Sequence, residues 1–185
     1  MVAVAAPPEV ITGAIVFTDI VGFTEFTALR GDAEALALLA IQDRIVEETL
    51  PPGSRVVKEL GDGLLLWFDS ACDGIETMMT LQQRFEEESE AAELPLWVRM
   101  GMHWGTPSRR GHDLLGHDVN LTSRICSFAG PGEVILSSQA VAAAGNAPAG
   151  VVFDEIGPVM MKGIPDPVRL FRATRDGASD DWSLD

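Results

Sequence analysis

Residues 17–24 read Phe17-Thr18-Asp19-Ile20-Val21-Gly22-Phe23-Thr24 and close a short apolar run that begins at Ala14. The β-branched and apolar residues 12–18 predict a buried strand, which delivers the carboxylate of Asp19 to its end. Gly22 then permits a sharp turn in front of Phe23 and Thr24. Taken alone, Asp19 could be no more than the cap of a following helix.

A second carboxylate occurs in Lys58-Glu59-Leu60-Gly61-Asp62-Gly63. Residues 55–60 and 64–68 predict two strands around the turn 61–63, because a Gly-Asp-Gly turn between apolar runs is a strong hairpin signal. Asp62 and Asp19 therefore both lie at strand ends beside glycines. Two such carboxylates, with free backbone amides nearby, suit a pair of divalent cations that hold a polyphosphate.

The rest of the chain alternates helical and strand patterns, which predicts one α+β domain with a mixed sheet covered by helices. We expect helices over 32–50, 70–90, 118–128 and 137–144, strands over 96–104, 134–136, 151–156 and 168–174, and an irregular polar excursion over 106–113. The last two strands flank a loop that carries Lys162.

Composition narrows the class of protein. The chain has 185 residues, 46% of them hydrophobic, and a formal net charge of −15. That charge repels nucleic acid and anionic lipid, so neither is expected as a partner, and no apolar run is long enough to span a membrane. Two cysteines make no disulfide framework, which indicates a reduced, cytoplasmic domain. We expect a flexible N-terminus over 1–10, a catalytic domain over 11–175 and a disordered acidic tail over 176–185.

A third segment, Asp113-Leu114-Leu115-Gly116-His117-Asp118-Val119-Asn120-Leu121-Thr122-Ser123-Arg124, adds a possible clamp. Asn120 and Arg124 are four residues apart and share one face of the predicted helix. An amide and a planar guanidinium on one face can hold a sugar and a phosphate together. An isolated pair with this spacing would be better explained as an ordinary polar helix face. Here several separate segments fit one scheme.

With these motifs, the chain resembles the catalytic domain of class III nucleotidyl cyclases from about Gly13 to Arg175. The resemblance implies a ferredoxin-like mixed sheet flanked by helices and a head-to-tail homodimer with active sites at the subunit interface. It implies that Asp19, Asp62 and the carbonyl of Ile20 hold two Mg²⁺ or Mn²⁺ ions. The turn that includes Phe23 and Thr24 would present backbone amides to the phosphates.

Lys58 and Asp113 match the pair that selects the base in this family. A lysine donates to adenine N1 and a carboxylate accepts from the N6 amino group, whereas guanine reverses both polarities. The chain has only two lysines, which argues against an incidental surface position for Lys58. We therefore expect ATP as substrate.

The remaining roles also follow from the resemblance. Asn120 would orient the ribose, Arg124 would meet the α-phosphate, and Arg99 and Lys162 would hold the triphosphate. From spacing alone, Arg99 could equally be an ordinary charge on the solvent-exposed face of a strand. Leu114, with Leu60 and Leu115, would wall the adenine, although a leucine beside a motif is commonly core. His103 is expected to be a packed core histidine.

The expected activity is that of an adenylyl cyclase, and three alternatives are weighed against it. A guanylyl cyclase would differ only in the choice of base. A nucleotide-binding regulatory domain without turnover would be expected to have lost a metal aspartate or the Asn120/Arg124 pair, and this chain keeps them all. A purely structural domain leaves the lysines unexplained. The segment 106–112 is shorter than the arm that many family members carry across the dimer.

Overall fold

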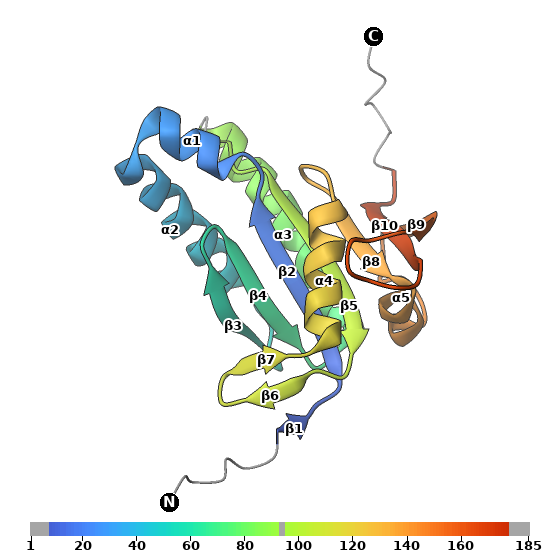
Figure 1. The fold of residues 1–185 in the computed structure, drawn as a ribbon. Helices are drawn as coiled ribbons and strands as arrows, with labels where there is room; N and C mark the ends of the chain where they lie inside the picture. Colours follow the sequence, from blue (N-terminus) through green and yellow to red (C-terminus); the bar gives the residue numbers. More distant parts are fainter. Residues whose placement is uncertain (1–7, 93–94, 178–185) are drawn as a thin grey trace, which may run out of the picture.

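A computed structural model describes residues 8–92 and 95–177, so the outer parts of both predicted flexible ends lie outside the described residues. Figure 1 shows the arrangement of the elements. In chain order they are β1 (Glu9–Val10), β2 (Gly13–Ile20), α1 (Phe23–Arg30), α2 (Asp32–Thr49), β3 (Ser54–Leu60), β4 (Gly63–Phe68), α3 (Ala71–Ala92), β5 (Val98–Gly105), β6 (Ser108–Arg110), β7 (Asp113–Leu115), α4 (His117–Phe128), β8 (Val134–Ser137), α5 (Ser138–Ala144), β9 (Val151–Val159) and β10 (Val168–Arg175).

A mixed sheet of seven strands forms the centre, in the order β3-β4-β2-β5-β8-β10-β9. Only β5 and β8 pair in parallel, and every other neighbouring pair in this sheet is antiparallel. The first four of these strands, together with α2 and α3, repeat the strand order of a ferredoxin-like fold. The predicted α+β class with a mixed sheet is confirmed.

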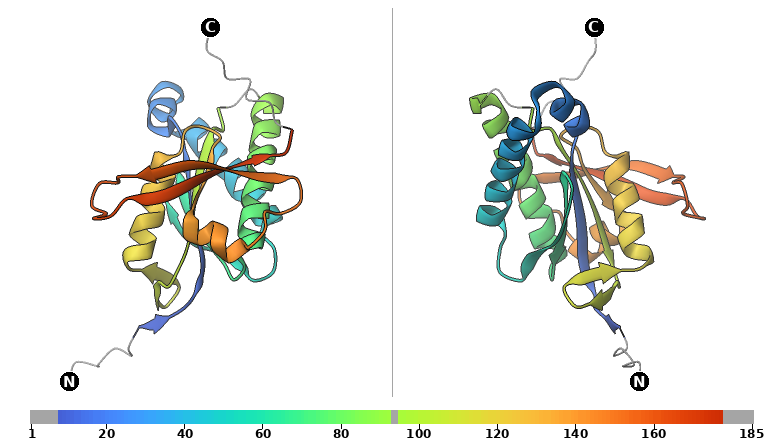
Figure 2. Two further views of the ribbon diagram at one scale, coloured as in Figure 1. Left: turned by 90° about the vertical axis from the view of Figure 1, so that its right-hand side faces the viewer. Right: turned by 60° about the vertical axis from the view of Figure 1, so that its left-hand side comes forward.

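The two faces of the sheet carry different partners because successive side chains of a strand alternate between them. Val16, Leu66 and Met102 share one large core cluster with residues of α2, α3 and α5. Ile15 and Leu65 face the other way, in a smaller cluster with Leu114 of β7. The two views of Figure 2 show α4 on the side of the sheet opposite to α2 and α3. We call the side that carries α4 and the β6–β7 hairpin the open face, because it is only partly covered.

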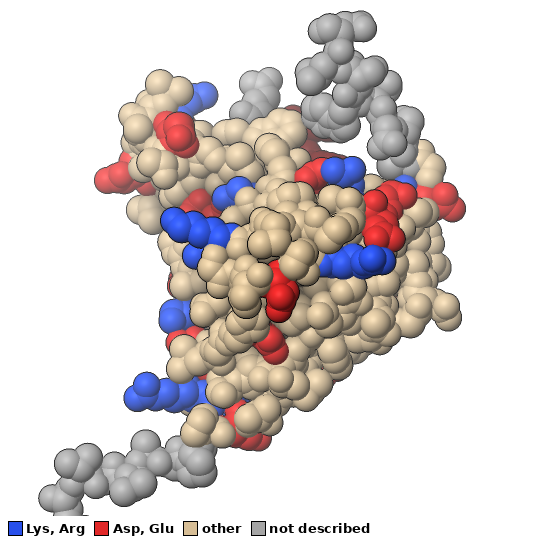
Figure 3. All heavy atoms as spheres, turned by 45° about the vertical axis from the view of Figure 1, so that its right-hand side comes forward, with Lys and Arg blue, Asp and Glu red and all other residues tan. Residues whose placement is uncertain are grey.

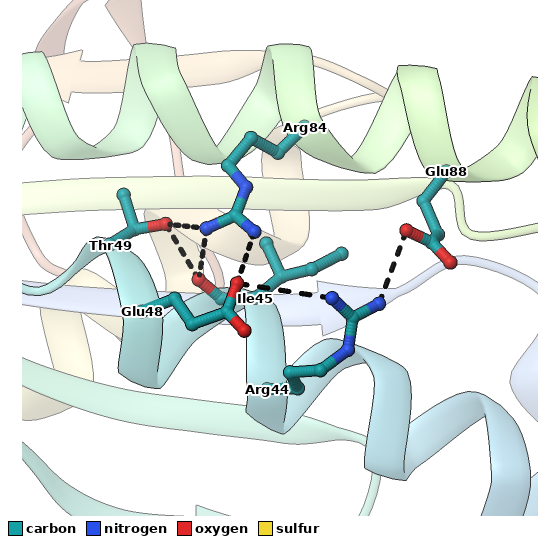
Figure 4. A network of polar contacts seen from close by, with 6 residues as sticks. All are labelled: Arg44, Ile45, Glu48, Thr49, Arg84 and Glu88. Atoms are coloured by element: carbon teal, nitrogen blue, oxygen red, sulfur yellow. Dashed lines mark hydrogen bonds and ion pairs between the residues drawn. The ribbon is translucent and has the colours of Figure 1, made fainter.

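Helices α2 and α3 are joined by the polar network drawn in Figure 4. Arg84 of α3 donates to the carbonyl of Ile45 at 3.2 Å and to the hydroxyl of Thr49 at 2.8 Å, and it also pairs with Glu48. Arg44 bridges in the opposite direction to Glu88 at 3.2 Å. The last turn of α2 has no basic residue of its own, so Arg84 supplies the cation that the end of that helix favours.

Two local predictions are wrong in detail, and one helix is additional to those predicted. The segment 106–113 is not irregular, because β6 and β7 form an antiparallel hairpin around Gly111, whose φ is 63°. Glu9 and Val10, assigned to the flexible N-terminus, pair with β6 instead. Helix α1 was not predicted as a separate element, and none of its residues is buried. Each of these short elements depends on contacts with its neighbours rather than on a strong pattern of its own.

Candidate active site

Asp19 and Arg99 form the first part of the candidate site, on the open face. They are register partners on the adjacent strands β2 and β5. The Nε and Nη2 atoms of Arg99 lie 2.7 and 2.6 Å from Oδ2 of Asp19. Nη1 of Arg99 also donates to the carbonyl of Ser127, at the end of α4, at 3.3 Å. Arg99 is therefore not an isolated charge on the solvent-exposed face of a strand, because it links Asp19 to α4.

Asp62 is brought beside Asp19 by the close pairing of β2 and β4. A Cβ atom on Gly63 would lie 2.5 Å from the carbonyl oxygen of Thr18, so a larger residue would force the strands apart. The hydroxyl of Thr18 accepts from the amide of Leu64 at 3.1 Å and fixes the same junction. From the opposite side, Nε2 of the buried Gln42 donates to the carbonyl of Asp62 at 3.3 Å.

The electrostatics of this pair fit divalent cations. Partial burial raises the pKa of Asp62 above its usual range, and the negative charge of Asp19 adds to that rise. Two carboxylates that repel each other supply the hard oxygen ligands that Mg²⁺ and Mn²⁺ prefer. Within residues 8–92 and 95–177 no group of three or more His, Cys, Asp or Glu side chains could hold a metal. A metal here would therefore need further oxygens, such as those of a polyphosphate.

Lys58 and Asp113 meet although they are 55 residues apart in the chain. Nζ of Lys58, on β3, lies 2.9 Å from Oδ2 of Asp113, on β7, and both side chains are partly exposed. Oδ1 of Asp113 accepts from the amide of Leu114 at 2.9 Å. The hydrogen bond from Lys58 lowers the pKa of Asp113 below its usual range, so this carboxylate is an acceptor at neutral pH.

Asn120 and Arg124 lie on the exposed side of α4. The helix buries Leu121, Thr122, Ile125 and Cys126, which leaves positions 120 and 124 turned away from the sheet. The structure gives neither side chain a hydrogen bond to any other described residue. An exposed amide and guanidinium on successive turns are available to a ligand.

Lys162 is carried on the loop between β9 and β10 and is exposed. Its neighbour Met161 is buried in one cluster with Leu121 and Ile125 of α4, so the loop packs beside the helix that bears Asn120. Phe23 and Thr24 begin α1, immediately after Gly22, whose φ of 77° makes the predicted turn. Ile20, at the end of β2, is 2% exposed as a whole residue.

Leu114 does not lie where the sequence places it. Its side chain is 1% exposed and packs with Ile15, Leu65 and Trp67. Leu60 and Leu115, at 41% and 45% exposure, remain on the surface beside Lys58 and Asp113. Of the three leucines, only Leu60 and Leu115 are therefore accessible to line a site for a nucleobase. Leu114 instead anchors the β6–β7 hairpin to the sheet.

A hollow of about 500 Å³ lies away from this site, between α3, the start of β5, the loop before β8 and the end of β10. Its lining includes Trp97, Glu133 and Arg172 and none of the predicted site residues. The metal group is defined as Asp19, Asp62 and Arg99, which the structure brings together. The clamp group is defined as the pair Lys58 and Asp113, the two exposed α4 residues Asn120 and Arg124, and Lys162 on the β9–β10 loop.

Two contributing residues were missed from the sequence. Gln42 is 1% exposed on α2, and Asp118 lies within the quoted motif but received no role. The only sequence signal for Gln42 is a polar residue among the apolar positions of a helix, which is too common a pattern to single it out.

The formal net charge of the chain is −15. On the face drawn in Figure 3, Lys and Arg side chains are interspersed with Asp and Glu.

Known proteins resemble this chain in sequence and in fold. A family model described as "Adenylate and Guanylate cyclase catalytic domain" matches residues 7–173. A pH-sensitive adenylate cyclase of Mycobacterium tuberculosis is 29% identical over 170 residues, covering 89% of this chain and 42% of its own length. An adenylate cyclase of Streptomyces coelicolor is 33% identical over 130 residues, covering 70% of this chain and 33% of its own length. The chain thus spans less than half of these relatives.

Among solved structures, the adenylyl cyclase CyaB of P. aeruginosa superposes with a TM-score of 0.79 at 19% identity, over 91% of this chain and 96% of that one. This likeness concerns the fold. No helix in the described part of the chain is long and apolar enough to cross a membrane.

Proposed function

This chain belongs to the family of adenylate and guanylate cyclase catalytic domains, and from that premise we propose that it converts ATP into 3′,5′-cyclic AMP and pyrophosphate at a site shared by two copies. The reaction is an attack by the 3′-hydroxyl of ATP on its own α-phosphorus. Such an intramolecular step depends mainly on positioning and on stabilising charge at the phosphates. The metal group and the clamp group supply side chains for both tasks.

The choice of ATP rests on one observation, the contact of Lys58 with Asp113 at 2.9 Å. It places a donor beside an acceptor at the open face, which matches adenine N1 and the N6 amino group. Guanine would set its N1–H against the ammonium and its O6 against the carboxylate. Each mispaired group would cost about 1–3 kcal/mol, so two of them give strong discrimination.

The metal group would hold two divalent cations through Asp19, Asp62 and the carbonyl of Ile20. When bound, Mg²⁺ or Mn²⁺ lowers the pKa of the attacking hydroxyl and neutralises phosphate charge. Free amides in the first turn of α1, at Phe23 and Thr24, would receive phosphate oxygens, which a helix N-terminus favours.

The clamp group would act on the nucleotide itself. Asn120 would hold the ribose, and the guanidinium of Arg124 would stabilise the negative charge that grows on the α-phosphoryl oxygens. Lys162, as a compact cation on a loop, would meet the terminal phosphates. Both α4 residues are free of hydrogen bonds to other described residues, so binding would break no existing contact of theirs.

A shared site is supported by the apolar surface around the clamp group. Leu60, Leu115, Phe128 and Met160 are 41%, 45%, 42% and 66% exposed, and each lies within four residues of a clamp-group residue. Exposed apolar side chains that surround polar site residues favour burial against a partner. In a two-fold dimer, the metal group of one copy would face the clamp group of the other, which gives two equivalent sites.

The test is to assay product from ATP and from GTP, under matched Mn²⁺ or Mg²⁺, beside Asp62→Asn. We expect cyclic AMP in preference to cyclic GMP, and a loss of about 10²-fold or more in kcat for Asp62→Asn. Glu59→Gln, which removes a charge from the same hairpin, should retain activity. A preference for GTP, or equal turnover in wild type and Asp62→Asn, would contradict the proposal.

A further inference from the structure

Helix α4 rests on β5 at two glycines. A Cβ atom on Gly101 would lie 2.3 Å from the backbone nitrogen of Cys126, and one on Gly105 would lie 2.3 Å from Oδ2 of Asp118. Both distances are shorter than any real contact, so only glycine allows the helix to lie this close. The carbonyl of Ser127, at the far end of α4, accepts from Arg99 of the same strand. The helix that bears Asn120 and Arg124 is thus held against β5 along its length.

Asp118 makes the contact at the first turn of α4. Its Oδ2 atom accepts from the amide of Thr106, immediately after β5, at 2.7 Å. Its Oδ1 atom lies 3.7 Å from Nε2 of His103, and the Asp118 side chain is 22% exposed. The Asp118 carboxylate therefore connects the first turn of α4 to His103, near the end of β5, and to Thr106, immediately after it.

His103 presents a defined hydrogen-bonding edge to Asp118. The Ser137 hydroxyl oxygen accepts from the amide of Ala140 at 3.2 Å, and it lies 2.9 Å from Nδ1 of His103. We assign the Ser137 hydroxyl as the donor and Nδ1 of His103 as the acceptor of this hydrogen bond. The proton of the neutral ring is then on Nε2, which faces Asp118. Burial lowers the pKa of His103, so the neutral ring is favoured, while Asp118 opposes that shift.

We propose that Asp118 is a positioning residue, which fastens the first turn of α4 to the end of β5 and thereby fixes Asn120 and Arg124 for the reaction. This inference rests on the proposed function. Asn120 follows Asp118 by two residues and Arg124 follows by six, both on α4. A tilt of this first turn would move both groups relative to the α-phosphate, and a displacement of about 1 Å can cost about 10²-fold in rate.

The simpler explanation is that Asp118 only neutralises the positive end of the α4 dipole. Asp73 provides the matched control, because it is an exposed aspartate in the first turn of α3. Asp73→Ala removes the same charge–dipole interaction from a helix that bears no site residue. It should leave kcat unchanged.

The experiment compares Asp118→Ala, Asp118→Asn and Gly105→Ala with wild type. We expect Asp118→Ala to lower kcat about 10²-fold while KM for ATP changes less than about threefold. Asp118→Asn should recover most of kcat, because its side-chain oxygen can still accept from the Thr106 amide. Gly105→Ala, which displaces the carboxylate without altering it, should reproduce the loss.

A double-mutant comparison separates positioning from general destabilisation. In an Arg124→Lys background, Asp118→Ala should cost less than in wild type, because the part of its effect that passes through Arg124 is already lost. An equal loss in both backgrounds, or a wild-type kcat for Asp118→Ala, would overturn the inference.

Amide hydrogen exchange provides a readout that does not depend on activity. Exchange over 117–128 should accelerate in Asp118→Ala while the β3–β4 hairpin stays protected. Unchanged exchange over α4 would refute the positioning role. Wild-type protein without any cyclase activity would instead refute the proposed function, so the two failures are distinct.

Discussion

The contact between Lys58 and Asp113 has a structural consequence beside its proposed role in selecting the base. Their contact joins β3 to β7, so the pair also has a structural role. The structural role depends on opposite charge alone, whereas selection of a base depends on which residue is the donor. Exchanging the two charges separates these roles.

We predict that the double variant Lys58→Glu/Asp113→Lys keeps its fold and reverses its preference between nucleotides. The swapped pair offers an acceptor to guanine N1–H and a donor to O6, so the ratio of kcat/KM for ATP over GTP should fall by about 10²-fold or more. Thermal unfolding serves as the control, because the ion pair is retained. A swapped protein that still prefers ATP would show that this pair does not read the base.

At this scale the sequence located most of the candidate site. Asp19 and Asp62 stood out because glycines flank them at strand ends, and Asn120 and Arg124 because of their helical spacing. Leu114 was misplaced because whether a leucine lines a site or enters the core depends on the angle of its hairpin. Asp118 was overlooked because its partner, the amide of Thr106, is a backbone group that leaves no trace in the sequence.

Among the elements, α4 and β5 depend most on close packing. The approach at Gly101 involves the backbone of α4, which cannot move aside as a flexible side chain can. Any side chain at this position must push the helix away from the sheet.

We predict that Gly101→Ala lowers both the melting temperature and kcat, since Asn120 and Arg124 move with α4. Overpacking of this kind costs about 1–3 kcal/mol. Gly74→Ala is the control, because it adds the same methyl group within α3, 3.3 Å from the flexible end of Met102. It should be neutral or stabilising, as alanine favours helix over glycine. Equal effects of the two substitutions on kcat would contradict a special role for Gly101.

The elements with strong patterns were predicted well, and the short ones were not. Residues 63–68 are buried throughout, and their continuous apolar run gave the strand β4 directly. The hairpin of β6 and β7 has only three residues in each strand and polar side chains on most of them. Its pairing depends on Leu114 in the core and on β1, which are tertiary contacts that no local pattern encodes.

In a single copy of the molecule, the residues predicted for the metal group are partly buried, and those of the clamp group are partly or fully exposed. An arrangement of this kind is incomplete as a single copy if both groups must contact one nucleotide. A second copy, related by a two-fold axis, would bring the missing group to each site.

Mixing two inactive variants tests this central claim directly. Asp19→Ala damages the metal group and Arg124→Ala damages the clamp group, so each homodimer has two defective sites. In a mixed dimer one site takes Asp19 and Arg124 from the unmutated halves and is intact. Random exchange of equal amounts should restore about a quarter of wild-type activity, since half of the dimers are mixed and each has one good site of two.

The control mixture combines Asp19→Ala with Asp62→Ala, two lesions in the same group, so every site stays defective. The measurement is cyclic AMP formed from ATP in each mixture after subunit exchange. The shared-site account predicts recovery near a quarter of wild type in the first mixture and none in the control. No recovery in the first mixture, or equal recovery in both, would contradict it.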